Sequence, residues 1–280
     1  MDKNQTIIIT GSSGFIGSRL VGHFLKLGFN VRTFQRAKCD YNNPMASCFH
    51  FELSEVKDMG FQGADYLVHS AYQPVIGRNR AADVNLEGAK KIISLCRKYG
   101  VKMVFLSTLS AHSEAESNYG RQKLLMESLF DPRQDLILKP GLVLGEGGGL
   151  FGRIASVLKT KKIIPLVGGG KQRVQTIELD DLCRIIELGI KKNICGSFMV
   201  ATPDAITLKE LYLNIAKKAG SKPLFIPVPT ILAYFILRFA EISGIRLPIT
   251  SENVLGLKHL KVFNTAPDLR RFGAVLKNYK

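Results

Sequence analysis

The sequence predicts an α/β fold, a doubly wound parallel sheet followed by a smaller C-terminal lobe. Three observations support this class: a glycine turn after a short apolar run near the N-terminus, alternation of strand-like and helix-like stretches up to Gly145, and a looser pattern rich in glycine and proline beyond it. We expect one domain over residues 1–145 and a smaller lobe over residues 146–280, with some chain returning to the first domain.

The first element is a strand followed by a helix, "TIIITGSSGFIGSRLVGHFLKLG". The continuous apolar run Ile7–Ile9 is typical of a strand buried on both faces, and apolar residues then recur at helical spacing until Gly28 ends the pattern. Between the two lie glycines at positions 11, 14 and 17. Such a turn lets backbone N–H groups approach a ligand, and a helix N-terminus favours a pyrophosphate. The motif therefore predicts a Rossmann-like NAD(P)-binding domain.

Five further strand-like runs follow in this domain: "FNVRTF", "CFHFEL", "DYLVHSA", "VKMVFLS" and "DLILKPG". Helix-like stretches separate most of them. The clearest, "NLEGAKKIISLCRKYG", places Leu86, Ala89, Ile92, Ile93 and Cys96 on one face. Such alternation implies a parallel sheet with helices on both faces, and ligands of open sheets bind beyond the carboxyl ends of the strands.

The second part contains a helix between the glycine-rich stretches "GEGGGLFG" and "VGGGKQR", and an apolar stretch from Pro229 to Ile245. This stretch is interrupted by Arg238 and Glu241 and is shorter than the roughly 20 residues that a membrane span needs. We expect a buried or groove-lining helix. Peripheral membrane contact is the less favoured interpretation.

Composition and charge favour a globular enzyme. Of 280 residues, 46% are hydrophobic and 22% are charged, and the net charge of +16 suits an anionic ligand. No long basic run, aromatic-basic motif or recognisable module indicates nucleic-acid binding. The five cysteines, at positions 39, 48, 96, 183 and 195, lack metal-ligand spacing, so we expect reduced thiols and no metal site. No signal peptide opens the sequence, and we expect a cytoplasmic protein.

Tyr119 and Lys123 are the candidate catalytic pair. They lie four residues apart in "SNYGRQKLLMESL", at the start of a predicted helix, so that their side chains project from one face on adjacent turns. A neighbouring ammonium favours the phenolate, so we expect the pKa of Tyr119 to fall from its ordinary value of about 10. The preceding strand ends in hydroxyls, "FLSTLS". The pattern predicts proton exchange with a substrate hydroxyl or carbonyl.

Together these motifs resemble the extended short-chain dehydrogenase/reductase superfamily, in the branch of nucleotide-sugar epimerases, dehydratases and ketoreductases. The further landmarks, in family order across nearly the whole chain, are "YLVHSA", Asn85 in "DVNLEGAKKI", "FLST", "YGRQK", "LKPGLVLG" and "GGGKQRVQTIELDDL". The resemblance implies cofactor contacts from Gly11, Ser13, Gly14, Phe15, Ile16, Gly17, Ala71 and Pro140. It also implies a homodimer, because relatives commonly dimerise through helices flanking the site.

The same resemblance implies roles near the reacting atoms. Lys123 would bind the nicotinamide ribose, Tyr119 would exchange a proton with the substrate, and Thr108 would hydrogen-bond the same oxygen. Ser107 and Ser110 compete with Thr108 for that role, with strand-end capping as their alternative. Only ten residues separate Thr108 from Tyr119, where many relatives have a longer insertion, and this departure leaves open which hydroxyl faces the substrate. Asn85 would support the site rather than perform chemistry.

The end of the second strand bears on cofactor choice. "VRTFQRAK" offers Gln35, Arg36 and Lys38, with no carboxylate before Asp40, whereas NAD-preferring sites usually carry an acidic residue there. The pattern resembles NADP-using reductases, with Arg36 as the leading ligand of the 2′-phosphate, and it predicts a preference for NADP(H) over NAD(H). A solvated basic loop is the alternative. Glu52, after the third strand, is expected near the adenine or on the surface.

Within the family, the sequence favours a ketoreductase. Leu109 and Ser110 stand where sugar dehydratases carry an Asp-Glu pair, which disfavours dehydration. Gly141 stands where galactose epimerases have an amide, so a site for UDP-galactose is not supported. Arg173 matches a position that often binds the substrate diphosphate in this family, and its fork geometry suits that task. A surface arginine without a ligand is the alternative. The resemblance, with the match at Arg173, implies a nucleotide-linked sugar as substrate.

Three alternatives stay open. An epimerase would keep NAD bound through oxidation and re-reduction, and the NADP-like strand end argues against it. A non-catalytic NADPH-binding subunit of a larger or membrane-associated assembly would not need Tyr119 and Lys123. A reductase of a hydrophobic alcohol or ketone would use the apolar stretch of the second lobe, but Arg173 argues against it.

Overall fold

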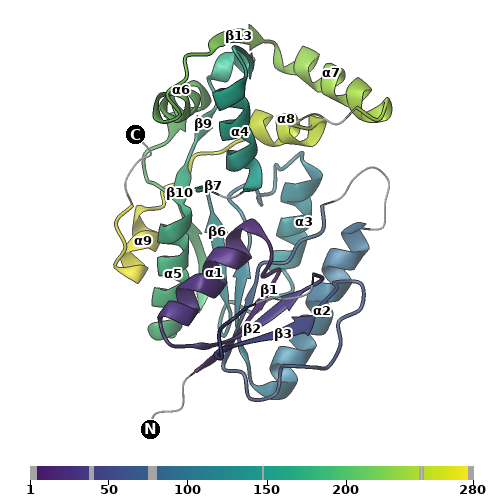
Figure 1. Cartoon of the computed structure of the whole chain (residues 1–280), viewed down its shortest axis with the longest axis vertical. Coiled ribbons are helices and arrows are strands. Elements are labelled where there is room, and N and C mark those ends of the chain that lie inside the picture. Colours follow the sequence, from purple (N-terminus) through teal and green to yellow (C-terminus); the bar gives the residue numbers. More distant parts are fainter. Residues whose placement is uncertain are drawn as a thin grey trace. The chain divides into compact units, whose positions relative to one another are not determined.

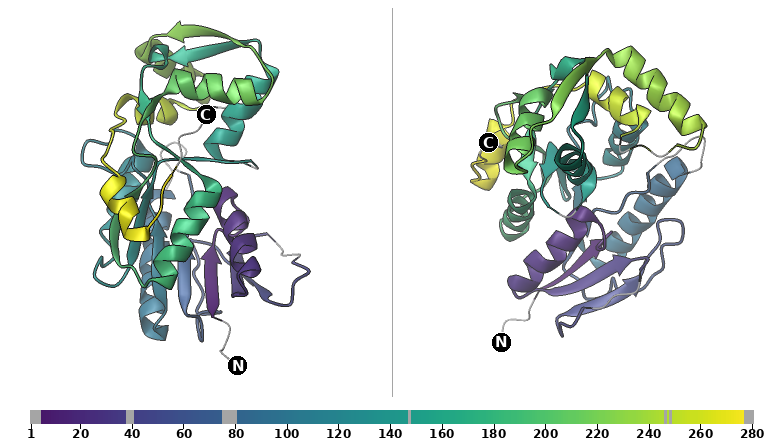
Figure 2. Two further views of the ribbon diagram at one scale, coloured as in Figure 1. Left: turned by 90° about the vertical axis from the view of Figure 1, so that its left-hand side faces the viewer. Right: turned by 45° about the horizontal axis from the view of Figure 1, so that its top comes forward.

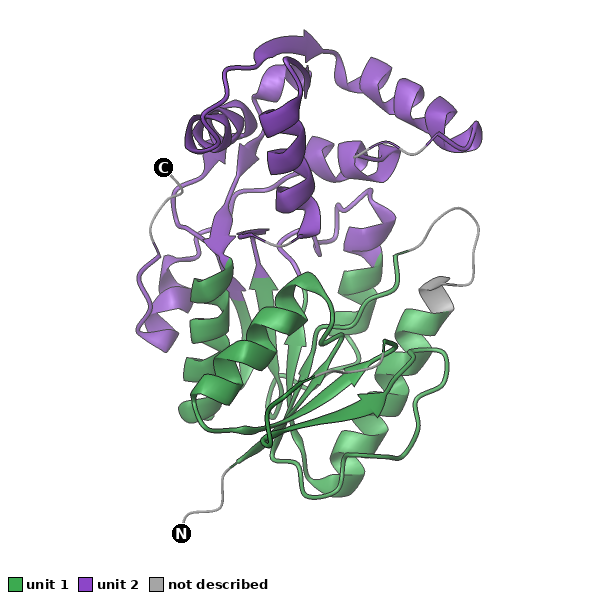
Figure 3. Ribbon diagram, viewed as in Figure 1, with its two compact units in different colours: residues 1–107, 122–139, 179–198 green, residues 108–121, 140–178, 199–280 purple. Residues whose placement is uncertain are grey.

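The computed structural model describes residues 5–37, 41–74, 81–146, 148–245, 247 and 249–276, with no side-chain description for residues 81–83. The chain divides into two compact units (Figure 3). Unit 1 consists of residues 1–107, 122–139 and 179–198, and unit 2 of residues 108–121, 140–178 and 199–280.

Unit 1 is built around a seven-stranded sheet (Figure 1). Its elements, some of which run on into unit 2, are β1 (Thr6–Thr10), α1 (Phe15–Lys26), β2 (Asn30–Gln35), β3 (Ala46–His50), β4 (Tyr66–His69), α2 (Ala81–Tyr99), β5 (Lys102–Leu106), α3 (Asn118–Glu127), β6 (Leu136–Pro140), α5 (Leu179–Lys191) and β11 (Gly196–Val200). The strand order is β11-β6-β5-β4-β1-β2-β3. Neighbouring strands from β6 through to β3 in this order are paired in parallel. The predicted doubly wound α/β sheet is confirmed, with its order reversing between β1 and β4.

The two faces of the sheet are covered by different helices, as Figures 1 and 2 show for α1 and α2. Side chains alternate along a strand, so Ile8 of β1 packs into the cluster that includes α2, and Ile7 and Ile9 point to the opposite face. All three isoleucines are fully buried. This two-sided burial is the reason for the continuous apolar run in the sequence.

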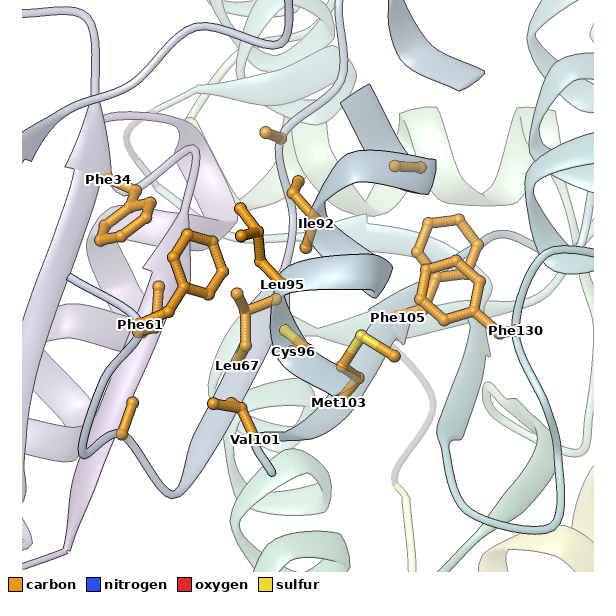
Figure 4. Close-up of a cluster of buried hydrophobic side chains, with 14 of the residues drawn as sticks. Phe34, Phe61, Leu67, Ile92, Leu95, Cys96, Val101, Met103, Phe105 and Phe130 are labelled. Atoms are coloured by element: carbon orange, nitrogen blue, oxygen red, sulfur yellow. The ribbon is translucent and has the colours of Figure 1, made fainter. Parts of the chain in front are cut away.

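A core of aromatic and aliphatic side chains fills the space between the sheet and α2 (Figure 4). Ile92 and Leu95 of α2 lie over Leu67 of β4, as their helical spacing predicts. The rings of Phe105 and Phe130 stack with centroids 4.4 Å apart. Burial of such side chains holds the strands in register, and through them the strand ends that carry the expected site residues.

Unit 2 is assembled from shorter elements. They are β7 (Leu142–Leu144), α4 (Gly149–Thr160), β8 (Ile163–Val167), η1 (Gly168–Gly170), β9 (Arg173–Val174), β10 (Thr176–Glu178), β12 (Ile206–Thr207), α6 (Leu208–Lys218), β13 (Leu224–Val228), α7 (Thr230–Ile242), α8 (Ser251–Lys258) and α9 (Ala266–Phe272). Three two-stranded sheets pair β10 with β7, β12 with β9 and β13 with β8. One core lies between α4, α6 and β8, where Leu158, Ile164 and Leu211 are buried.

The apolar stretch expected to be buried or to line a groove forms α7, which is buried on one face only. Its buried residues are Ala233, Leu237 and Ala240, whereas the large side chains of the opposite face are exposed. Phe239 and Ile242, for example, are 71% and 74% exposed. Hydrophobicity predicted the helix, but the side that packs against α8 is the side with the smaller residues.

The expectation of five reduced thiols is wrong in part, because Cys48 is disulfide-bonded. Cys96, Cys183 and Cys195 are free, and Cys39 lies outside the described residues. In the part of the chain that the structure describes, no three or more His, Cys, Asp and Glu residues gather in a group that could hold a metal ion. Across the same ranges, no helix has both the length and the apolar character to cross a membrane.

Candidate functional site

The glycine turn of unit 1 brings backbone close to backbone. Gly11 has a φ of +67°, and a Cβ there would lie 2.9 Å from the Cα of Ala71. A Cβ on Gly17 would lie 2.1 Å from the carbonyl oxygen of Gly11, so only glycine lets α1 start against the turn. Ser13 and Gly14, by contrast, are exposed. The turn is therefore tight on its inner side and accessible on its outer side.

The first turn of α1 provides the donors of this cradle. The first helical hydrogen bond of α1 runs from the N–H of Ser18 to the carbonyl of Gly14 at 2.9 Å. The N–H groups of Phe15, Ile16 and Gly17 come before this bond, in the first turn, where N–H groups have no acceptor within the helix itself. Phe15 and Ile16 are half-buried. N–H groups at the positive end of a helix dipole fit the pyrophosphate of a dinucleotide.

The end of β2 lies next to this turn. The Ser12 hydroxyl donates a hydrogen bond to the side-chain oxygen of the buried Gln35 at 2.9 Å, and the Gln35 amide donates to the carbonyl of Ala37 at 3.3 Å. Arg36 follows the strand and is exposed. Lys38 and Asp40 lie outside the described residues. The described end of β2 therefore offers a cation and an amide, and no carboxylate.

The end of β4 is fixed to the end of β1. The Oγ1 of Thr10 lies 2.8 Å from the Nδ1 of His69 and accepts a hydrogen bond from the N–H of Ala71 at 3.3 Å. The Ser70 hydroxyl donates to the carbonyl of Thr10 at 2.6 Å. Burial, and to a smaller extent the charge of Lys123, lowers the pKa of His69 to about 3, so the imidazole is neutral at pH 7. These bonds hold Ala71 where the ribose contact is expected.

Asn85 of α2 anchors the chain that follows β4. Its side-chain oxygen accepts from the N–H of Gln73 and its amide donates to the carbonyl of Gln73, both at 2.8 Å. The Asn85 amide also lies 3.3 Å from the side-chain oxygen of Gln122, which accepts from the Tyr72 hydroxyl at 3.1 Å. Asn85 is fully buried, and its contacts agree with the expected supporting role.

Lys123 is buried within unit 1. Its Nζ donates to the carbonyl oxygen of Leu106 at 2.7 Å and lies 5.1 Å and 4.8 Å from the ring centroids of Tyr72 and Phe105. Burial lowers the pKa of Lys123 to about 7, although the charge of Glu127 opposes the shift. Both its neutral and its charged forms are therefore populated near neutral pH.

Ser107 follows β5, and its hydroxyl is hydrogen-bonded to a side chain of α3. The buried Ser107 donates a short hydrogen bond to the carboxylate of Glu127. The other oxygen of Glu127 accepts from Lys139 at 3.0 Å. This engagement supports the structural interpretation of Ser107 and leaves Thr108 as the better candidate for the hydroxyl near the substrate.

In unit 2, the side chain of Thr108 lies close enough to Tyr119 to lower the pKa of the phenol. The Oγ1 of Thr108 also accepts from the N–H of Ser110 at 3.2 Å. A Cβ on Gly120 would lie 2.4 Å from the carbonyl of Ser110, so glycine lets α3 begin against this turn. The short connection between Thr108 and Tyr119 thus brings the hydroxyl and the phenol together.

The pKa of Tyr119 differs from the expectation. Desolvation raises it to about 12, although 41% of the residue is exposed, and the side chain of Thr108 lowers it by less. The expected lowering by Lys123 is therefore wrong for this structure. Desolvation is the larger cause of the shift, and Thr108 is the group that opposes it. Tyr119 rests as a protonated phenol, which is the form that can donate a proton.

Pro140, an expected cofactor contact, and Gly141, which replaces the amide of galactose epimerases, lie at the start of unit 2's second segment. Pro140 ends β6, is buried, and accepts a hydrogen bond from the N–H of Leu109 at 2.9 Å. A Cβ on Gly141 would lie 2.4 Å from the carbonyl oxygen of Gln175. An amide side chain of the galactose-epimerase kind therefore cannot be placed at Gly141 without moving this backbone.

Arg173 opens β9 and is exposed. Its Nη2 donates to the carbonyl oxygen of Ala205 at 2.8 Å, which uses one of the five N–H donors of a guanidinium. Hydrogen bonds from Thr207 hold the pKa of Glu210 below its ordinary value, and the charge of Arg173 adds to this effect. Arg173 is thus a surface cation positioned by the β9–β12 pair.

Glu52 follows β3 in unit 1 and is half-buried. Its contacts are with neighbours in the chain, since Ser54 donates to it at 3.5 Å and His50 lies 3.5 Å away. These contacts leave the adenine role of Glu52 as an expectation.

Sequence reasoning missed three residues of this region: His69, Gln122 and Glu127. A signal existed for Glu127, which lies four residues after Lys123 on the same helix and can therefore approach it. His69 and Gln122 carried no spacing that distinguishes them, because their partners are far away in the sequence.

Known proteins similar to this chain include reductases and epimerases. The chain is 24% identical over 257 residues to the uncharacterized protein y4nG of Sinorhizobium fredii, a match covering 82% of this chain but only 65% of that protein. It is 25% identical to the ceramide reductase of Caulobacter vibrioides, over 81% of this chain and 75% of that protein. It is 21% identical to the N-acetyl-alpha-D-glucosaminyl-diphospho-ditrans,octacis-undecaprenol 4-epimerase of Escherichia coli O157:H7, over 90% and 85% of the two chains.

Solved structures share the fold. The Bordetella bronchiseptica enzyme WbmG, in complex with NAD and UDP, superposes with a TM-score of 0.73 at 16% identity, covering 99% of this chain and 91% of that one. Residues 7–195, which include the glycine turn, Thr108, Tyr119 and Lys123, match the model of one protein family. The chain therefore belongs to the NAD dependent epimerase/dehydratase family.

Proposed function

We propose that this chain is an NADPH-dependent ketoreductase that acts on a nucleotide-linked sugar. The observation that carries the proposal is the proximity of the Thr108 side chain to Tyr119, in a chain whose Lys123 follows four residues later on the same helix. When bound, the nicotinamide supplies the hydride. The protein's own task is to orient the substrate carbonyl and to provide the proton.

Each of these residues has a defined task in the proposal. Tyr119 donates its phenolic proton to the substrate oxygen, and its raised pKa keeps that proton in place until hydride transfer creates an alkoxide. Thr108 hydrogen-bonds the same oxygen and orients the phenol. Lys123 holds the nicotinamide ribose with the donors that its bond to Leu106 does not use, since an ammonium has three.

The preference for NADPH rests on Arg36. The described end of β2 places an exposed guanidinium where NAD-preferring sites usually carry a carboxylate. A guanidinium binds a phosphate with two parallel hydrogen bonds, which suits the 2′-phosphate of NADPH.

The nucleotide-linked substrate rests on Arg173. Its bond to Ala205 fixes the side chain and leaves further N–H donors for a diphosphate. The solved structure of WbmG, which has a similar fold, is described in complex with NAD and UDP. An epimerase that retains NAD is the competing member of the same family, and the experiment below separates the two.

A second candidate is the reduction of a hydrophobic ketone or of a sugar carried on a lipid. The observation that favours it is the exposed apolar face of α7 in unit 2. Two of the relatives, the ceramide reductase and the undecaprenol 4-epimerase, have names that state a lipid-containing substrate. On this second proposal α7 lies near the lipid part of the substrate, and Tyr119 and Lys123 keep the same tasks.

A titration with NADPH and NADH tests the reductase proposal. The unmodified protein should prefer NADPH by at least about tenfold, and Arg36→Ala should remove most of that preference by weakening NADPH alone. Arg133→Ala is the matched control, because Arg133 is an exposed arginine just before β6, at the amino-terminal end of that strand. It should leave both affinities unchanged. A preference that survives Arg36→Ala would place the 2′-phosphate elsewhere.

The reaction itself is then tested with keto-sugar nucleotides. Stoichiometric oxidation of NADPH in the presence of one of them supports the ketoreductase. Interconversion of two sugar nucleotides without net oxidation of added NADPH would instead support the epimerase. Turnover of a long-chain ketone or a lipid-linked sugar, but of no soluble sugar nucleotide, would support the second candidate.

A further inference from the structure

Helix α7 carries its large apolar side chains on the outside. Six large apolar side chains of this helix are between 51% and 74% exposed: Ile231, Leu232, Phe235, Ile236, Phe239 and Ile242. Their spacing places them on one face of the helix, and we call this set the α7 outer face. Figure 1 shows α7 following β13 along the edge of unit 2, with α8 on its other side.

The opposite, inner face of α7 has smaller side chains and is packed against the rest of unit 2. Ala233 and Leu237 pack with Val167 and Val254 in a separate core cluster of unit 2. The helix therefore buries two alanines and a leucine and exposes two phenylalanines, three isoleucines and a leucine. An apolar surface of this kind is unusual on a free protein and marks a place of interaction.

The charged side chains of α7 are also distributed unevenly around the helix. Its one carboxylate, Glu241, accepts hydrogen bonds from the N–H and the hydroxyl of Ser251 at 2.7 Å and 2.8 Å, so it is turned towards the start of α8. Arg238 is half-exposed and lies 3.5 Å from the same carboxylate. The outer face thus carries large apolar groups and no acidic group.

Positive charge predominates in the sequence on either side of this helix and in the composition of unit 2. Residues 217–247 contain one acidic residue, Glu241, against Lys217, Lys218, Lys222, Arg238 and Arg246. Unit 2 holds 19 of the 39 Lys and Arg residues but only nine of the 23 Asp and Glu residues, so most of the net charge of +16 belongs to it.

From this combination we infer that the α7 outer face docks on the surface of an anionic lipid bilayer. The apolar side chains would enter the boundary between headgroups and acyl chains, while the cations of unit 2, Arg238 of α7 among them, meet the anionic headgroups. A helix of 13 residues is about 20 Å long, shorter than the apolar thickness of a bilayer, so it lies in the plane of the surface. A second copy of the chain fits less well, because pairing through this face would bring two positively charged units together.

The inference goes beyond the proposed function and is tested without turnover. The full chain is mixed with vesicles of phosphatidylglycerol and phosphatidylcholine, or of phosphatidylcholine alone, and the bound fraction is measured by flotation. We expect binding to the anionic vesicles, weaker binding to the neutral ones, and a loss of binding as salt is raised.

Matched variants connect the binding to α7. The double variant Phe235→Ser with Phe239→Ser should lower the partition onto anionic vesicles by at least about tenfold. The control, Leu213→Ser with Val275→Ser, changes two exposed apolar residues elsewhere in unit 2 and should bind like the unmodified protein. Because all four residues are exposed, thermal unfolding without vesicles should be nearly the same for both variants, which shows that folding is intact.

Three results would overturn the inference. One is the absence of vesicle binding by a folded, unmodified protein. Another is equal loss of binding in both double variants. The third is sedimentation equilibrium showing a dimer that Phe235→Ser with Phe239→Ser turns into a monomer, with no vesicle binding, since the face would then serve a second copy.

Discussion

The ammonium of Lys123 donates a hydrogen bond to the carbonyl oxygen of Leu106 at 2.7 Å, in a place where only 3% of the lysine is exposed. This relationship explains why the pKa of Lys123 falls to about 7: one carbonyl does not replace the water that the ammonium loses.

The stability of the protein should depend on pH through Lys123. Between pH 7 and its ordinary pKa of 10.5 the unfolded state keeps this proton and the folded state does not, so the free energy of unfolding gains up to about 1.4 kcal/mol per pH unit from this group as pH rises. Urea unfolding at pH 7.5 and pH 9 measures it. In Lys123→Met, which lacks this group, the free energy of unfolding should rise less between pH 7.5 and pH 9, by up to about 1.4 kcal/mol per pH unit. Equal increases in the free energy of unfolding of both proteins would contradict the burial argument.

His69 should act in the opposite pH range. Its pKa of about 3 lies below the ordinary value of 6.5. Between these two values the imidazole is protonated in the unfolded state and neutral in the folded state. Between pH 6.5 and pH 5 this lowers the free energy of unfolding by about 2 kcal/mol. His69→Gln, which does not titrate, should lose that much less stability in urea unfolding over the same interval. The prediction fails if the two proteins lose the same amount.

Tyr119 should be needed for chemistry and not for cofactor binding. Tyr119→Phe removes the proton donor, so kcat with the identified keto substrate should fall by about 10² to 10⁴-fold, while the affinity for NADPH stays within about twofold. Thr108→Val should lower kcat as well, because it removes the hydroxyl close to the phenol. Ser110→Ala is the control and should have little effect on kcat, since Ser110 meets Thr108 through its backbone N–H. Unchanged turnover in Tyr119→Phe would remove Tyr119 from the mechanism.

Two glycines of α1 should respond oppositely to alanine. At Gly17 a Cβ would lie 2.1 Å from the carbonyl of Gly11, so Gly17→Ala should destabilise the fold by about 1–3 kcal/mol and weaken NADPH binding by moving the turn. At Gly22 a Cβ meets nothing within 4 Å, so Gly22→Ala should stabilise the helix by about 0.5–1 kcal/mol and leave the affinity unchanged. Chemical unfolding and titration check both variants. The same result at both positions would contradict the geometry of the turn.

Local pattern predicted much of unit 1. The apolar run at Ile7–Ile9, the glycines and the helical spacing after them specify a strand, a turn and a helix without reference to distant residues. The same holds for the helix of Ile92 and Cys96, now α2. The sheet followed from the alternation of such elements, because parallel strands need crossover connections.

What the sequence could not predict depends on contacts between distant residues. The pKa of Tyr119 is set by desolvation, which no spacing reveals. Ser107 was a candidate hydroxyl until the structure showed it bonded to Glu127. The exposure of α7 was also hidden, because a helix that is apolar on most sides does not indicate which side its neighbours cover.

Identifying the dinucleotide that the protein retains tests the central claim most directly. The chain is purified without added cofactor and denatured, and any released dinucleotide is identified and quantified by mass spectrometry. The proposal of an exchanging NADPH-dependent reductase predicts little bound dinucleotide, with NADPH bound more tightly than NADH when either is added back. Stoichiometric retained NAD would contradict it, and would point instead to an epimerase that keeps its cofactor through a complete cycle.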